Sequence, residues 1–194
     1  MPADHATVEQ DTRRWLERAV IGLNLCPFAK AVHVKGQVHY AVSDATDAAA
    51  LRQDLVLELK SLVALDPQVR DTTLLIAPVA FPAFLDFNDF LAEADDALAE
   101  LDLRGTIQIA SFHPRYQFAG TAEDDITNHS NRAPYSTLHL LREASIDRAV
   151  AAFPEAEAIF EANMATLEKL GHAGWDALGV GPSAHAGPCG KLKP

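Results

Sequence analysis

The sequence predicts an α/β fold: a single domain with a small, largely parallel sheet of three or more strands flanked by helices. Two short apolar runs, 72–77 and 106–112, have the length of buried strands, and they are bounded by Pro78 and Gly105. Segments with helical spacing of apolar residues separate these runs and follow them. Strands that alternate with helices are joined by right-handed crossovers, so the sheet is expected to be largely parallel.

The elements before residue 113 follow from periodicity and punctuation. A first helix is expected to begin near Thr7, which has capping-box spacing to Gln10, and to end before Pro27. The β-branched residues of 31–42 indicate a strand, with Gly36 making it a short hairpin or a bulge. Further helices are expected at about 46–65 and 84–102.

The second half of the chain begins with a long polar segment. Residues 113–134 have no periodicity, and loops of that length are usually functional or disordered. Helices are expected at about 135–152 and from Pro154 to about Leu170. The expected organisation is therefore one domain over 8–170 and a Gly/Pro-rich C-terminal tail over 171–194, which contains Cys189.

Composition limits the classes of partner. The chain has 194 residues, 48% hydrophobic and 22% charged, and its net charge is -11, which disfavours nucleic acid and anionic membranes. Two cysteines, no signal-peptide pattern and no membrane-length apolar run indicate a cytoplasmic protein. The expected partner is a small anionic metabolite; the sequence has no cofactor fingerprint, and it leaves the cofactor and the oligomeric state unknown.

Polar residues are densest over 111–143. On a helix over 135–152, four side chains would share one stripe beside a leucine face: Tyr135, His139, Arg142 and Glu143. The alternative is an ordinary solvated helix face.

Three segments, 15–30, 111–120 and 131–143, resemble the DUF1415 family of uncharacterised bacterial proteins, and the resemblance covers roughly residues 8–170. Ser136 replaces a proline of the family pattern, and His129 replaces a tyrosine, which counts against His129 as an indispensable ligand. The resemblance implies no known activity.

The leading hypothesis is an enzyme that acts on an anionic metabolite, a carboxylate or a phosphate, by histidine acid–base chemistry. His113 is the main candidate because it directly follows a buried strand and titrates near neutrality. Tyr116 is a candidate to orient it or to donate a proton, and His139 and Glu143 are expected to complete the catalytic group. The alternative is that His113 only hydrogen-bonds the loop backbone.

Substrate binding is assigned to amide, guanidinium and phenol groups near the expected helix start. These residues are Asn128, Asn131, Arg132, Tyr135 and Arg142. The alternative is that the arginines pair with Asp124, Asp125 and Glu143.

Cys26 is a candidate nucleophile, with a buried small hydrophobic side chain as the alternative. It follows a helix C-terminus, where the helix dipole disfavours a thiolate. It is also expected at the amino end of the first strand, away from His113.

Two alternatives to the enzyme hypothesis stay open. The first is a metal-dependent enzyme or metal carrier that uses His113, His139, Asp124 and Asp125, with His129 as a further candidate, although no compact metal signature is present. The second is a non-catalytic ligand-binding or interaction domain, in which the polar residues lock the long loop in place.

Overall fold

A computed structural model describes residues 4–152 and 158–183, and it has the α/β architecture that the sequence predicts. The helices are α1 (His5–Trp15), a π-helical continuation η1 (Leu16–Ile21), α2 (Ala29–Val34), α3 (Ala48–Ala64), α4 (Phe84–Glu100), the 3-10 helix η2 (Ile126–Asn131), α5 (Glu143–Ala152) and α6 (Ile159–Ala177). The strands are β1 (Val38–Val42), β2 (Thr72–Ala77), β3 (Ile107–Phe112) and β4 (Ser136–Arg142).

The four strands form one mixed sheet in the order β1-β2-β4-β3. β1 and β2 pair in parallel, while β4 runs antiparallel to both β2 and β3. The prediction of a largely parallel sheet is therefore wrong. The strands expected from the sequence do run in one direction, but the unexpected β4 inserts between two of them.

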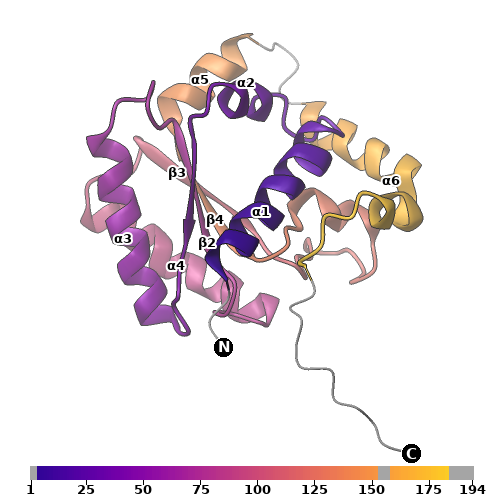
Figure 1. Ribbon diagram of the computed structural model, residues 1–194, viewed down its shortest axis with the longest axis horizontal. Coiled ribbons are helices and arrows are strands. Elements are labelled where there is room, and N and C mark those ends of the chain that lie inside the picture. The colour runs from indigo at the N-terminus through magenta and orange to yellow at the C-terminus, as the bar shows by residue number, and fades with distance from the viewer. Residues whose placement is uncertain (1–3, 153–157, 184–194) are drawn as a thin grey trace, which may run out of the picture.

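Each face of the sheet carries its own apolar core. One face, which we call the α3/α4 face, packs Leu75, Leu138 and Leu140 against those two helices. The other face, the α1 face, packs Tyr40, Leu74 and other side chains against α1 and η1. Figure 1 shows the sheet between these layers, with α3 and α4 on one side and α1 on the other.

The expected helix over 135–152 is half strand. Residues 136–142 form β4, and only Glu143–Ala152 is helical. β4 lies between two strands and is covered on both faces, so leucines occupy both sides of it. The spacing and the leucine content of this segment are typical of a helix. Its position between two strands of the sheet overrides this helix propensity.

Because residues 136–142 form a strand, the side chains of the expected polar stripe lie on different faces. Alternate residues of a strand point to opposite faces. His139 therefore lies on the α1 face together with Tyr135, while Arg142 lies on the α3/α4 face and Glu143 begins α5. The four side chains therefore do not share one stripe. No helix begins near Tyr135, so Arg132 does not lie at a helix start.

The expected strand over 31–42 is half helix. Residues 29–34 form α2, and β1 begins only at Val38. Gly36 has φ +68° in the turn between them, a conformation that glycine adopts without steric cost. Gly36 therefore marks a helix-to-strand turn instead of a hairpin or a bulge.

Two ends also differ from expectation. The cap of α1 is Asp4, whose carboxylate accepts the Thr7 N–H, so the predicted Thr7–Gln10 capping box is wrong. α6 continues past Leu170 to Ala177, with a break at Gly171 (φ 64°).

Pro154, the expected start of this last helix, and Cys189 lie outside the described residues. Among the described residues, every helix is too short or too polar to cross a membrane.

Candidate functional site

His113 sits at the carboxyl end of β3 with both ring nitrogens occupied. Nδ1 accepts the Arg115 N–H at 3.0 Å, so Nε2 carries the proton and donates it to the Phe81 carbonyl at 3.0 Å. The ring is 1% exposed and stacks on Phe87, and burial lowers its pKa. Phe81 has φ +58°, a strained value for a non-glycine residue, and His113 holds the carbonyl of that residue. His113 therefore holds the turn at Phe81 and the start of the 113–134 loop in place.

Three other candidates, all in the 113–134 loop, hydrogen-bond the backbone of that loop or of β3. Asn128 accepts the Phe118 N–H at 3.0 Å, and Asn131 donates to the Ser111 carbonyl at 3.2 Å. Arg132 donates to the carbonyls of Tyr116 at 3.0 Å and Glu123 at 2.6 Å. An anionic ligand would have to replace these bonds.

Tyr135 and Arg142 bind other parts of the chain. The Tyr135 hydroxyl donates to the buried Asp11 carboxylate at 2.8 Å. Arg142 Nη2 donates to three backbone carbonyls, those of Leu62, Leu65 and Arg70, and so ties β4 to the end of α3.

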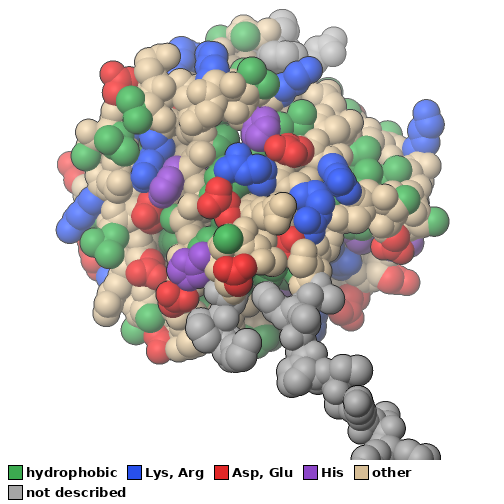
Figure 2. All heavy atoms as spheres, in the orientation of Figure 1, with side chains coloured by type: hydrophobic (Ala, Val, Ile, Leu, Met, Phe, Trp, Pro, Cys, Tyr) green, Lys and Arg blue, Asp and Glu red, His purple; other side chains and the backbone are tan. Residues whose placement is uncertain are grey.

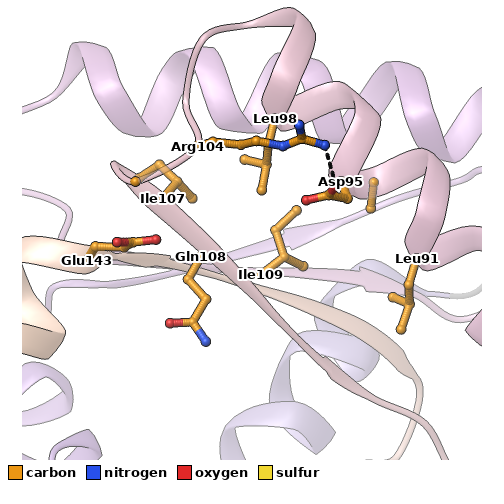
Figure 3. A pocket seen from close by; sticks show the side chains of 10 residues that line it. Leu91, Asp95, Leu98, Arg104, Ile107, Gln108, Ile109 and Glu143 are labelled. Atoms are coloured by element: carbon orange, nitrogen blue, oxygen red, sulfur yellow. Dashed lines mark hydrogen bonds and ion pairs between the residues drawn. The ribbon is translucent and has the colours of Figure 1, made fainter.

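Tyr116 and Glu143 also lie apart from each other. The Tyr116 ring packs against Phe84 and Phe118, with centroids 4.9 and 5.0 Å away, and burial raises the pKa of its hydroxyl. Glu143 lines a groove between β3 and α4, where Figure 3 shows it beside Gln108.

The residues of the metal hypothesis do not converge. His113 packs against α4 on one face of the sheet, while His139 lies on the opposite face. Asp125 caps η2 by accepting the Thr127 N–H at 2.9 Å. Over residues 4–152 and 158–183, no group of three His, Cys, Asp or Glu side chains is arranged to hold a metal ion.

The α1 face of the sheet contains a cavity of about 670 Å³, which we call the sheet-face cavity. Its floor comes from all four strands, and its walls come from η1, α2, α5 and the segment before β2. Apolar side chains dominate the lining; they include Val20, Val38, Leu74, Phe112 and Leu141. The volume lies in the usual range for ligand pockets of about 300–1,000 Å³.

The sheet-face cavity brings together two of the candidate residues, Cys26 and His139. β1 and β2 contribute residues near their amino ends, at Val38 and Thr72, while β3 contributes residues up to its carboxyl end at Phe112. The cavity therefore extends across the face of the sheet and is not confined to the strand carboxyl ends, where parallel sheets usually place a site.

His139 has a defined tautomer. Thr72 Oγ1 donates its one proton to the Leu140 carbonyl at 2.7 Å, so its 2.7 Å bond to His139 requires Nε2–H as the donor. Nδ1 then carries a lone pair, and no described residue hydrogen-bonds it. Burial lowers the pKa of His139 to about 4, so the ring is neutral at pH 7.

Cys26 is a protonated thiol in the same cavity. Burial raises its pKa, which outweighs hydrogen bonds from the backbone N–H groups of Phe28 and Ala29 at the start of α2. The sequence shows Cys26 only as the end of the first helix, because α2 lies hidden in the expected strand.

Two cationic side chains at the cavity are absent from the sequence-based candidates. Lys35 follows α2 and Arg148 lies in α5, and neither forms an ion pair with a described carboxylate. Arg148 instead donates to Ser145 at 2.9 Å, and Ser145 donates to Asp71 at 2.6 Å. Figure 2 shows Lys and Arg side chains around α2 and α5 at the top of the view. No sequence motif marks these residues, because α2 and α5 are far apart in the sequence and line one cavity only in the fold.

The fold and the site define an α/β protein with a ligand-sized apolar cavity on one face of a mixed four-stranded sheet. The chain belongs to the family described as "Protein of unknown function (DUF1415)", which matches residues 7–177. No curated protein and no solved structure matches it.

Proposed function

We propose that this protein binds a small organic anion, with an apolar body and one carboxylate or phosphate group, in the sheet-face cavity. The single observation that carries the proposal is the cavity itself, about 670 Å³ of mostly apolar lining beside two cations that form no ion pair with a carboxylate of the described residues. Enclosed apolar surface with a few convergent polar groups is the usual form of a small-molecule site.

The apolar lining favours a ligand with a hydrocarbon body. Leu74, Phe112 and Leu141 project from three adjacent strands into the floor, where the polar side chains of Thr72, Gln108 and His139 lie among them. Each CH₂ group that moves from water onto such a surface contributes about 0.8 kcal/mol. Affinity should therefore rise with the length of the ligand until the cavity is full.

The cations favour an anionic head group. Lys35 and Arg148 lie at the exposed margin of the cavity, where a head group can stay hydrated while the body is buried. Among the described lining residues Asp71 is the one acidic side chain, and it accepts a hydrogen bond from Ser145, which in turn accepts one from Arg148. The chain has 27 acidic and only 16 basic residues, so two basic side chains beside an apolar cavity favour an anionic ligand there.

His139 gives the ligand a hydrogen-bond acceptor inside the apolar region. Its Nδ1 lone pair suits a ligand O–H or N–H group, and any acid–base chemistry in the cavity would use this nitrogen instead of His113. The neutral ring accepts a proton only weakly, so hydrogen-bond recognition is its main proposed role.

A thermal-shift screen of matched n-alkyl carboxylates and n-alkanols tests the proposal. The melting temperature should rise with chain length, and each carboxylate should exceed its matched alcohol. Saturation at about 100 times Kd corresponds to about 2.7 kcal/mol of stabilisation. Ala110→Phe, which fills the cavity floor, should abolish every shift.

Variants of the two cations and of His139 separate the contribution of charge to ligand binding from that of the hydrogen-bond acceptor. The double variant Lys35→Ala/Arg148→Ala should remove the preference for carboxylates, while Arg52→Ala/Lys60→Ala on α3 should keep it. His139→Leu should leave simple alkyl carboxylates bound and weaken only ligands with an added hydroxyl. A screen without any chain-length dependence would contradict the proposal.

A further inference from the structure

β3 is an edge strand whose outward main-chain groups can be identified from the ladder. Glu143 N–H donates to the Thr106 carbonyl at 3.0 Å, one step before the β3–β4 pairs. Hydrogen-bonded pairs alternate along an antiparallel ladder, so the even-numbered residues of β3 bond β4. The odd-numbered residues, Ile107, Ile109 and Ser111, therefore direct their N–H and C=O groups away from the sheet.

Contacts within the chain cap two of these six outward groups. The Ile107 N–H donates to the Leu103 carbonyl at 3.0 Å, and the Ser111 carbonyl accepts from Asn131 at 3.2 Å. The Ile107 carbonyl, both groups of Ile109 and the Ser111 N–H have no hydrogen-bond partner in the described part of the chain. Two donors and two acceptors thus remain on the edge.

We propose that β3 pairs antiparallel with β3 of a second copy of this chain, about a two-fold axis at Ile109. In this register each Ile109 N–H donates to the partner copy's Ile109 carbonyl, and each Ser111 N–H donates to the partner copy's Ile107 carbonyl. All four free groups of each copy are then bonded. The two capped groups, Ile107 N–H and Ser111 C=O, are the ones that would have paired next, so the pairing ends where the chain itself caps the edge.

The side chains of β3 leave this edge unprotected. Edge strands usually avoid pairing through charged side chains, proline or bulges, and 107–112 (IQIASF) contains no charged residue and no proline. Ile109 points toward Leu91 and Leu98 of α4 in a groove of about 250 Å³, and the Arg104–Asp95 ion pair lies across its upper side (Figure 3). The two-fold axis would bring two such grooves together.

The pairing also connects two sheet-face cavities. Gln108, Ala110 and Phe112 line the cavity from β3. A two-fold axis perpendicular to the sheet joins the four strands of each copy into one continuous sheet, with both cavities on the same face. The inference stands on the hydrogen-bond pattern of β3 and does not depend on what the cavity binds.

Light scattering of the full chain on a sizing column tests the pairing. The wild type should have twice the monomer mass of 21.0 kDa. Ile109→Lys and Ile109→Glu should each be monomeric, because like charges then face each other across the axis. An equal mixture of the two variants should restore the dimer mass, and Leu57→Lys, at an exposed position of α3, should leave the wild-type dimer intact.

Circular dichroism and a cooperative melt show whether the Ile109 variants fold. If they do not, Ser111→Pro replaces them, since it removes one outward N–H and no ladder bond. A monomeric wild type would overturn the proposal, as would dimeric Ile109 or Ser111 variants, or folded Lys and Glu variants that stay monomeric when mixed. A monomer that carries another protein on β3 would overturn it too.

Discussion

Replacing Asp11 by alanine should lower the free energy of unfolding by about 3 kcal/mol, because it removes the acceptor of a buried network. The Asp11 carboxylate is 1% exposed. It accepts from Tyr135 Oη at 2.8 Å, from Arg14 at 2.6 Å, and from Ser183 N–H and Oγ at 2.7 and 2.6 Å. Burial alone would raise the pKa of Asp11, but these bonds hold it below its ordinary value.

The same network fastens the segment after α6 to α1. Arg14 donates to the carbonyls of Gly179 and Gly181, and Arg18 donates to that of Leu178. Removing Asp11 therefore leaves a buried hydroxyl unpaired and also loosens this segment.

Urea unfolding at pH 7 measures the effect, with Tyr135→Phe as the matched control. That variant loses one hydroxyl and keeps the carboxylate, so it should cost only about 1 kcal/mol. Equal losses in the two variants, or a loss below about 1 kcal/mol for Asp11→Ala, would show that the carboxylate is not the centre of the network.

Stability should fall steeply between about pH 6.5 and pH 4. Burial lowers the pKa of His129 and of His139 from 6.5 to about 4, and it lowers that of His113 as well. The unfolded chain therefore takes up protons first as the pH drops through 6.5, while the folded chain resists until about pH 4. The pKa shifts of His129 and His139 each correspond to a loss of up to about 3 kcal/mol in the free energy of unfolding.

Urea midpoints at a series of pH values check this expectation. His129→Phe and His139→Leu should each shrink the drop. The loss from Asp11 belongs to a lower range, below its ordinary pKa of 3.8, because its pKa is lowered further by folding. A flat profile from pH 7 to pH 4.5 would contradict the buried neutral state of these rings.

Local sequence patterns predicted the helices that bury one face and the strands that are bounded by glycine or proline. β2 was predicted at the observed bounds because it is a short apolar run that ends before Pro78, and α3 and α4 were predicted to within two residues because leucines and phenylalanines repeat on one face. β4 was missed because coverage on both faces removes the alternation that identifies a strand, and because no glycine or proline separates it from α5.

The site was less predictable than the fold. His139 and Cys26 were singled out, but on a helix stripe and a helix end that the structure replaces with β4 and the start of α2. Lys35 and Arg148 line the same cavity only because the fold places α2 and α5 around it. Two helices so far apart in the chain leave no spacing signal in the sequence.

Protection of Cys26 from alkylation by a bound carboxylate tests whether the ligand occupies the sheet-face cavity, because this thiol lines it. The measurement is the iodoacetamide rate at Cys26, by mass spectrometry, in a Cys189→Ser background. An n-alkyl carboxylate at about ten times its Kd should slow alkylation about tenfold. Lys35→Ala/Arg148→Ala should lose this protection at the same ligand concentration. An unchanged rate at Cys26, under conditions where the ligand raises the melting temperature, would place the ligand elsewhere and contradict the proposed function.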